Sequence, residues 1–258
     1  SRYTAYTQGR EDYLQATWHP AHRPASLNLA EDAATKWLGL AIKQISGAVR
    51  VHCNRVFVPE LGVMQLRQYT LSIAPGAMHF RISVKREDAT DATPAGRVSN
   101  LLHASYNKGD IIDLAVPFGD FYLHEDRHTP VVLISGGVGV TPMISMLKHL
   151  ISTAKDRQVQ FIHTCRNAEV LAFGARLHKA AADNPQLEVR IFHDAGPVAE
   201  FGVVGSLDLG TLALPADADY YLCGPDGFLM AHIARLHALG VESARIHAEV
   251  FSTGGVAV

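Results

Sequence analysis

The sequence predicts two domains, a small antiparallel β-barrel followed by an α/β domain with a parallel sheet. Its 258 residues suffice for both, because domains commonly contain roughly 100–200 residues. From Val131 onward, short β-rich runs alternate with helical patterns, whereas the middle of the chain has alternating apolar residues divided by turn residues. We therefore assign residues 1–126 to the barrel domain and residues 127–258 to the α/β domain.

Five strands are expected in the α/β domain, because five short runs are rich in β-branched and aromatic residues. They cover residues 131–135, 159–164, 187–193, 219–223 and 245–250. A first helix should begin with Thr141 as its N-cap and Pro142 as its first helical residue. Further helices are expected over 168–182 and 227–239, the last one ended by Gly240 in the left-handed conformation.

Shorter alternating runs predict the antiparallel barrel. The expected strands are 65–73, 79–84, 111–115 and 121–123. Pro75 and Gly76 separate the first two strands, as turn residues do in a hairpin. The polar run 124–129 is the expected linker between the domains. Residues 1–50 fit the barrel pattern least well, and within them 30–45 has the apolar spacing of an amphipathic helix.

Composition favours small-molecule chemistry in a reduced, cytoplasmic protein. The net charge is −2, without long like-charge blocks, so there is no electrostatic reason to expect nucleic acid or a membrane surface as a partner. No apolar run approaches the ~20 residues of a membrane-spanning helix. Cys53, Cys165 and Cys223 lie too far apart for a metal or iron–sulfur pattern, and the 14 histidines are scattered. We therefore expect no metal site and no disulfide framework.

A glycine-rich turn is the sharpest local signal of a binding site. Residues 135–142 read Ser-Gly-Gly-Val-Gly-Val-Thr-Pro, directly after an apolar strand and at the start of a helix. Glycines let backbone N–H groups approach a phosphate, with the positive end of the helix dipole behind them. The alternative is a tight turn that binds nothing. Because the run is not the six-residue Rossmann fingerprint, it names no ligand by itself.

A second signal lies on the predicted strand 65–73. This strand carries Arg67, Gln68, Tyr69, Thr70, Leu71 and Ser72. Arginine offers a planar fork for a phosphate, and a neighbouring tyrosine can stack on a flat ring. The alternative is an ordinary, partly solvated strand face, on which arginine and tyrosine are common.

Two further motifs lie at the ends of predicted elements. The first reads Gly96, Arg97, Val98, Ser99 and Asn100, a helix start whose donors could hold a phosphate or whose serine could simply cap the helix. The second, Cys223, Gly224 and Pro225, follows a strand of the parallel sheet. Ligands of such sheets lie at the carboxyl ends of the strands, although a buried structural cysteine is the usual alternative.

The order of these motifs resembles that of the ferredoxin–NADP reductase superfamily. From about residue 56 to 251, the chain is similar to the reductase portion of bacterial flavohemoglobins. The similar stretches are RQYTLS, RISVKRE, VSNLLH, VVLISGGVGVTPMISMLK, DADYYLCGP and ARIHAEVF. The resemblance implies that the barrel domain binds FAD and that the α/β domain binds NADH or NADPH.

The resemblance also implies roles for the matching residues of the barrel domain. Arg67 would neutralise an FAD phosphate, Tyr69 would pack on the isoalloxazine, and Thr70 would bond near flavin N5. Ser99 would hold the pyrophosphate with Val98 and Asn100. The remaining residues implied to bind the cofactor are Gln68, Leu71, Ser72 and Gly96.

In the α/β domain, the resemblance implies a nicotinamide dinucleotide site. The turn would contribute Gly136, Gly137, Gly139, Thr141 and Pro142, and Cys223, Gly224 and Pro225 would lie beside the nicotinamide. Phe251 would cover the flavin face until the nicotinamide arrives, and Glu249 would be a polar neighbour of the flavin. Arg166, just after the second strand, could contact a ribose or a 2′-phosphate. From the two domains together, we assign five residues to the reaction centre: Tyr69, Thr70, Cys223, Glu249 and Phe251.

The implied function is an oxidoreductase that takes a hydride from NAD(P)H onto FAD and passes electrons to a separate acceptor, such as a haem globin in a nitric oxide dioxygenase. The alternatives are a flavin-binding electron-transfer or regulatory subunit with little nicotinamide turnover, and a nucleotide-binding shell that retains no FAD. Two departures stand out. The family's Pro-Gly-Gln-Tyr segment is missing, and Ala248 replaces a tyrosine near the C-terminus.

Overall fold

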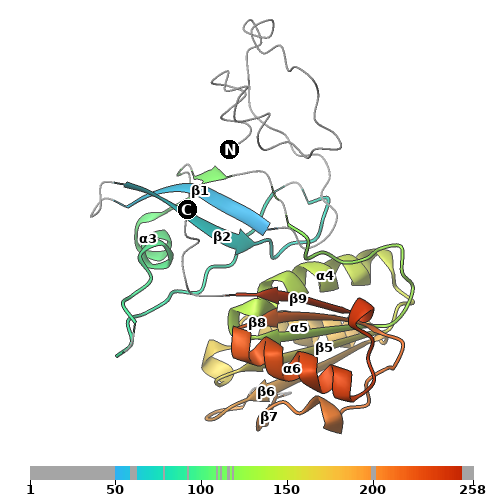
Figure 1. Cartoon of the computed structure of the whole chain (residues 1–258). Coiled ribbons are helices and arrows are strands. Elements are labelled where there is room, and N and C mark those ends of the chain that lie inside the picture. The colour runs from blue at the N-terminus through green and yellow to red at the C-terminus, as the bar shows by residue number, and fades with distance from the viewer. Residues whose placement is uncertain are drawn as a thin grey trace, which may run out of the picture.

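The structure, a computed structural model, describes residues 50–58, 63–77, 79–91, 93–108, 110, 112–114, 117, 119–198 and 202–251. The described chain has an antiparallel part, with β1 to β3 and α3, and an α/β part that contains all later elements (Figure 1). The predicted helix over 30–45 lies outside the described residues.

The antiparallel part contains a three-stranded sheet in the order β2-β1-β3. Its strands are β1 (Arg50–Val58), β2 (Val63–Thr70) and β3 (Asp113–Leu114), and the helix α3 (Arg97–Ser105) follows β2. Sequence patterning missed β1. The pairing of β1 with β2 shifts register between Cys53 and Val56, and such a bulge breaks the two-residue alternation that identifies a strand.

The predicted barrel strands have mixed outcomes. β2 confirms the first of them with slightly different bounds, and β3 lies within the third. The predicted strand 79–84 is wrong. Only an isolated bridge joins Leu71 to Ile82, because the chain leaves the sheet on both sides of that pair. The predicted strand 121–123 is also wrong, since Phe121 and Leu123 instead bury their side chains in the core of the α/β part.

The α/β part contains a six-stranded parallel sheet in the order β7-β6-β5-β4-β8-β9. The strands are β4 (Val131–Gly136), β5 (Val159–Cys165), β6 (Leu187–His193), β7 (Gly202–Val204), β8 (Asp219–Gly224) and β9 (Ile246–Val250). The five predicted strands are confirmed to within about one residue at each end. β7 was missed because three residues at the sheet edge are too few to show a period.

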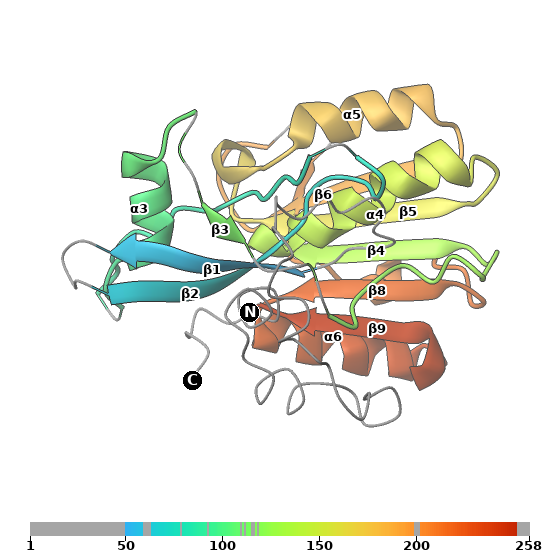
Figure 2. The same ribbon diagram turned by 90° about the horizontal axis from the view of Figure 1, so that it is seen from above.

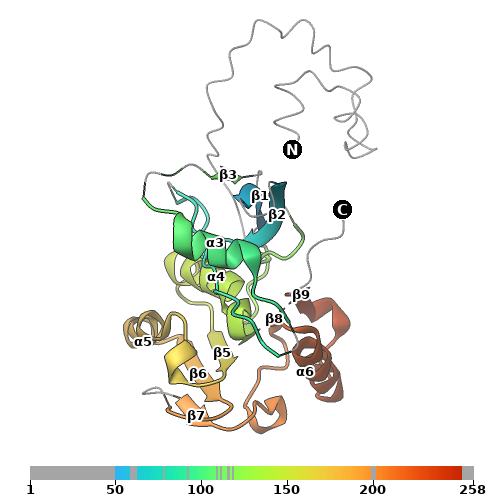
Figure 3. The same ribbon diagram turned by 90° about the vertical axis from the view of Figure 1, so that its left-hand side faces the viewer.

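Helices cover both faces of this sheet. α4 (Val140–Thr153) and α5 (Gly174–Asp183) lie on one face and α6 (Asp226–Ala238) on the other (Figure 3). Each face has its own apolar core, one with Met143 and Leu177, the other with Leu229 and Leu236. None of the helices within the described ranges is long and apolar enough to cross a membrane.

The predicted helix 168–182 is interrupted. A short 3-10 turn (Ala168–Val170) comes first, and α5 begins only at Gly174, after Phe173 has adopted a left-handed φ of 63°. The predicted end of the third helix is confirmed, because Gly240 has a φ of +85° just beyond α6.

Candidate dinucleotide and flavin site

The carboxyl edge of the parallel sheet brings two of the predicted motifs together. The chain leaves β4 toward β5 on one side, whereas β8 lies on the other side of β4, so the strand order reverses between β4 and β8. Ligands of open α/β sheets bind in the crevice at such a switch point. The glycine turn follows β4 and Cys223-Gly224-Pro225 follows the body of β8, so both motifs lie at this switch point.

The glycine turn packs directly on the backbone at the end of β8. A Cβ added to Gly139 would lie 2.1 Å from the carbonyl oxygen of Cys223 and 2.9 Å from the amide nitrogen of Gly224. Gly137 has a φ of +54°, which favours glycine. These two positions therefore require glycine for steric reasons, and the bare backbone of the turn can approach a phosphate.

Phe228 of α6 lies under both motifs, and sequence patterning did not single it out. A Cβ on Gly136 would lie 3.2 Å from the Phe228 ring, and a Cβ on Gly224 would lie 2.8 Å from it. The ring therefore fills the space that the two glycines leave between the ends of β4 and β8. Its position three residues after Pro225 was the only available signal.

The start of α4 differs from the prediction. Thr141 is not the N-cap, because a 3-10 turn (Gly137–Gly139) leads straight into the helix and Gly139 takes the capping position. Thr141 is the second helical residue and Pro142 the third. The Thr141 hydroxyl donates to the carbonyl of Val138 at 3.1 Å, and the side chain is buried. The hydroxyl thus braces the turn from within.

The C-terminal strand brings Phe251 to the same edge of the sheet. The Phe251 amide donates to the carbonyl of Gly224 at 3.0 Å, which extends the pairing of β8 and β9 by one residue. Glu249 is on β9, opposite Cys223. Arg166 is exposed just beyond the carboxyl end of β5, at the same edge of the sheet. The structure therefore brings these predicted residues to one edge.

The predicted flavin strand ends beside α4. Arg67, Gln68 and Tyr69 are half-buried on β2, whereas Thr70, Leu71 and Ser72 are buried. Tyr69 packs against the cluster around Val98 of α3. The Ser72 amide donates to the carbonyl of Arg81 at 2.8 Å, and its hydroxyl shares a 2.8 Å hydrogen bond with that of Ser83. The end of this segment is therefore fixed by backbone and side chain together.

The predicted phosphate motif is the start of α3, with Gly96 as the N-cap. The Ser99 hydroxyl donates to the carbonyl of Gly96 and accepts from the amide of Glu87. The side-chain amide of Asn100 donates to the carbonyls of Glu87 and Gly96. These side chains therefore shape the turn. The amides of residues 97–99 precede the first helical hydrogen bond, which Asn100 donates to Gly96, so any phosphate contact would fall to them.

Two side chains of α4 connect the α/β part to the segment after β2. The Ser145 hydroxyl donates to the carbonyl of Ile73 at 2.7 Å, and the Lys148 ammonium donates to the carbonyl of Ser72 at 3.1 Å. Figure 2 shows the chain after β2 running toward α4. The helix that begins in the glycine turn therefore also holds the end of the predicted flavin segment.

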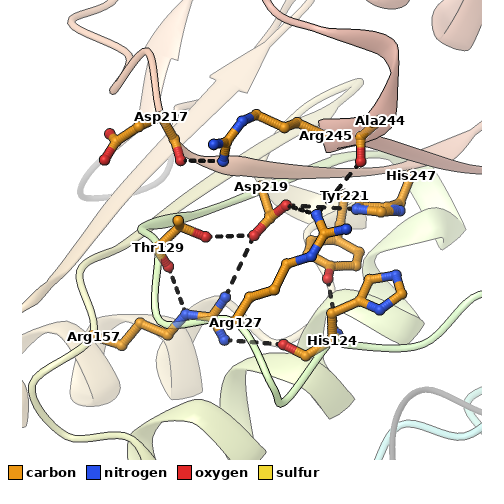
Figure 4. A network of polar contacts seen from close by, with 10 residues as sticks. All are labelled: His124, Arg127, Thr129, Arg157, Asp217, Asp219, Tyr221, Ala244, Arg245 and His247. Carbon is orange, nitrogen blue, oxygen red and sulfur yellow. Dashed lines mark hydrogen bonds and ion pairs between the residues drawn. The ribbon is translucent and has the colours of Figure 1, made fainter.

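At the opposite edge of the sheet, the predicted linker 124–129 forms a polar network with Asp219 (Figure 4). The Asp219 carboxylate accepts from the hydroxyl of Thr129 at 2.5 Å and from the guanidinium of Arg127 at 2.5 Å. Arg157 donates to the carbonyl of Thr129 at 2.6 Å. This segment is thus tied to the amino end of β8, which a polar sequence alone did not indicate.

The network keeps Asp219 ionised although its side chain is fully buried. Burial opposes the charge, but the hydrogen bonds from Thr129 and Arg127 outweigh it and lower the pKa of the carboxylate. Burial also raises the pKa of Tyr221, whose hydroxyl accepts the amide of His124, to about 12. The ring of His247 stacks on Tyr221. Burial is the main cause that lowers the pKa of His247, and the neighbouring His124 lowers it further.

A second buried polar pair lies under the glycine turn. Ser135 and the Nδ1 atom of His163 are 2.9 Å apart, and burial lowers the pKa of His163 to about 4. Farther along β5, the Sγ atom of Cys165 lies 3.4 Å from the Nδ1 atom of His193 on β6. Burial raises the pKa of the Cys165 thiol. Across the described ranges, no three His, Cys, Asp or Glu side chains gather as a metal site would need.

The two ends of the chain match models of two different families. The model of the oxidoreductase NAD-binding domain matches residues 133–234, which run from β4 into α6. The model of the YchJ middle NTF2-like domain matches residues 1–58. The structure describes only the last nine of those residues, which form β1 and pair with β2.

Individual relatives point to one family. The chain is 48% identical over 212 residues to a flavohemoprotein of Bordetella pertussis, with 79% of this chain and 52% of the relative covered. Identity to a flavohemoprotein of Chromobacterium violaceum is 47% over 205 residues, with 76% and 50% covered. The chain thus spans about half the length of these relatives.

A solved structure matches over more of its own length. The flavohem-like FAD/NAD binding domain of nitric oxide dioxygenase from Vibrio cholerae has a TM-score of 0.72 and 36% identity, with 80% of this chain and 88% of that chain covered. The matched region includes most of the described chain, the six-stranded parallel sheet among it. The chain therefore belongs to the family of flavohemoglobin reductase domains, within the ferredoxin–NADP reductase superfamily.

Proposed function

We propose that this chain takes a hydride from NAD(P)H onto FAD and passes the electrons to a separate acceptor. Membership of the family makes it an NAD(P)H-dependent flavin oxidoreductase. One observation carries the proposal: the glycine turn and the Cys223-Gly224-Pro225 segment meet at the switch point, and α4 connects that turn to the end of β2.

The crevice suits a nicotinamide dinucleotide. The backbone of Gly136, Gly137 and Gly139 would hold its pyrophosphate, because the turn packs closely on the end of β8 and its glycines carry no side chains of their own. Thr141 and Pro142 would keep the turn in shape. Residues 223–225 and Phe251 would border the nicotinamide, and Glu249 would lie near it. Arg166 would contact the ribose, where its charge decides how well a 2′-phosphate is accepted.

The antiparallel part would be the FAD domain, closed as a barrel and extending over residues 1–126. Arg67 would neutralise an FAD phosphate, Tyr69 would pack on the flavin ring and Thr70 would bond to its edge. Gln68, Leu71 and Ser72 would complete that wall. The start of α3 would hold a phosphate through the amides of residues 97–99, which precede the first helical hydrogen bond from Asn100 to Gly96.

Bound FAD supplies a ring system that accepts a hydride and releases electrons to other centres. The residues of the chain would bind the two cofactors, orient them and shield them from water. Arg67 and the α3 amides neutralise phosphate charge, and the glycine turn aligns the dinucleotide. The hydrogen bond from the Phe251 amide to the Gly224 carbonyl fixes Phe251 beside the end of β8, where its ring would shield the nicotinamide from water. A haem globin is the proposed acceptor, because the matching relatives are flavohemoproteins, and the cytoplasm is the proposed location.

Anaerobic spectroscopy of the purified full chain tests this proposal. After incubation with FAD and removal of the excess, the protein should retain a flavin spectrum that NADH bleaches. Retained flavin that NADH and NADPH leave oxidised would support a subunit without nicotinamide turnover and reject the proposal. A colourless protein would indicate a shell that cannot hold FAD, and would reject it as well. Comparing NADH with NADPH in Arg166→Ala would then assign the cofactor preference.

A further inference from the structure

α4 links the turn proposed to hold the dinucleotide to the segment that follows the proposed flavin strand. Ser145 and Lys148 are three residues apart on α4 and therefore share one face of the helix. α4 starts directly after Gly139, so the helix is a rigid continuation of the turn that would hold the dinucleotide.

One acceptor, the Ser72 carbonyl, belongs to the last residue of the proposed flavin wall, and the other, the Ile73 carbonyl, to the residue after it. Ser72 and Ile73 are the second and third residues after Thr70, the last residue of β2. The amide and hydroxyl of Ser72 are tied to Arg81 and Ser83 on the other side. Because the segment is held from two sides, a shift of α4 would move the end of β2 with it.

The surroundings of the two donors support a defined geometry. Ser145 is fully buried, so its hydroxyl cannot exchange this carbonyl for water without cost. Lys148 is half-buried. Burial is the main cause that lowers the pKa of Lys148, and the charges of Arg81 and Arg176 lower it further. The hydrogen bond to the Ser72 carbonyl offsets part of the cost of keeping this half-buried ammonium charged.

We propose that Ser145 and Lys148 are positioning residues that clamp the Ser72–Ile73 backbone and thereby set the spacing between the nicotinamide and the flavin. The inference rests on the proposed function and deepens it. Neither residue would touch a cofactor. Each would act through the strand end that holds the flavin and the turn that holds the dinucleotide.

The test uses the full chain loaded with FAD and mixed anaerobically with NADH. Three quantities are measured for each variant: the rate constant of flavin reduction, the Kd for NADH, and the long-wavelength charge-transfer absorbance of the NADH–flavin complex. The charge-transfer band reports stacking geometry and does not depend on turnover. Thermal midpoints confirm that each variant is folded.

The variants are Lys148→Met, Lys148→Arg and Ser145→Ala. We expect Lys148→Met to lower the reduction rate constant about tenfold, because small misplacements of reacting atoms slow such steps strongly. The charge-transfer band should weaken while the Kd for NADH changes less than about twofold, since the dinucleotide turn is untouched. Lys148→Arg should restore most of the band and rate. Ser145→Ala should act in the same direction as Lys148→Met.

Two matched controls lie on or next to the same helix. The Ser152 hydroxyl donates only to His149 within α4, and Lys155 is exposed just after the helix, so Ser152→Ala and Lys155→Met should behave like the parent chain. If Ser145→Ala and Lys148→Met match these controls in rate and band, the clamp has no positioning role. If Lys148→Met does not fold, Ser145→Ala decides alone. A parent chain whose flavin NADH never reduces would instead overturn the proposed function.

Discussion

The two parts of the molecule differ in how they are held together. The α/β part has apolar cores of 17 and 10 buried residues on the two faces of its sheet. In the antiparallel part, the cluster formed by described side chains has one fully buried member, Val98, with partly buried neighbours. The α/β part therefore has its own apolar frame on both faces of the sheet, and hydrogen bonds from Ser145 and Lys148 attach the segment after β2 to that frame.

The largest expected effect is on the joint between the two parts. Asp219→Asn should lower the free energy of unfolding by about 3–5 kcal/mol, because it leaves the buried cation of Arg157 uncompensated. Urea unfolding at neutral pH measures this. Asp208→Asn, which removes an exposed ion pair with Arg235 in the same part, is the matched control and should cost much less. Equal losses in the two variants would show that the network does not stabilise the frame.

Acid should destabilise the α/β part through His163. Its pKa is about 4 in the folded chain and 6.5 unperturbed, so the unfolded chain takes up the proton first as the pH falls. The contribution of neutral His163 to the free energy of unfolding is full above pH 6.5 and is lost as the pH falls toward 4. It amounts to roughly 3 kcal/mol, because the pKa is lowered from 6.5 to about 4. Unfolding free energies between pH 7 and 4 test this. His163→Gln should remove most of the slope, and an unchanged slope would contradict the assignment.

Glycine substitutions compare the parts directly. Gly139→Ala should cost about 2–3 kcal/mol and abolish NADH binding, because its Cβ would collide with backbone at the end of β8. Gly76→Ala, in the antiparallel part, meets open space and strains only a φ of +77°, so we expect about 1 kcal/mol. Thermal unfolding and NADH titration distinguish the two. A Gly139→Ala variant that still binds NADH would place the dinucleotide elsewhere.

Among the four main predictions, the smallest effect is expected from the cofactor. At a free FAD concentration tenfold above its Kd, the chain should gain about 1.4 kcal/mol of stability. Hydrogen exchange should show the added protection mainly in β2 and α3, with little change in β5 and β6. Uniform protection of both parts would mean that the antiparallel part needs no help from FAD.

Much of the α/β part could be predicted because its signals are local. Apolar strands, helical spacing and Gly240 each reveal themselves within a few residues. The contacts that join the parts could not be predicted in this way. Thr129 and Asp219 are 90 residues apart in the chain, and nothing in the polar run 124–129 distinguishes it from a solvated linker.

The candidate site shows the same division. The glycine turn and the Cys-Gly-Pro segment were found because they are contiguous motifs. Phe228 and Ser145 were not, since an apolar residue or a serine on a helix has no distinctive pattern. Thr141 was wrongly predicted as an N-cap, because a 3-10 turn ahead of a helix leaves no mark in the sequence. The barrel as a whole stays a prediction.

The position of Asp219 has a practical consequence for protein engineering. The joint that it forms lies at the amino edge of the parallel sheet, whereas the crevice opens at the carboxyl edge. Residues such as Arg166 can therefore be randomised to alter coenzyme choice without touching the joint. Libraries built at that rim should retain a high fraction of folded members, which makes this scaffold suitable for directed evolution of its nucleotide preference.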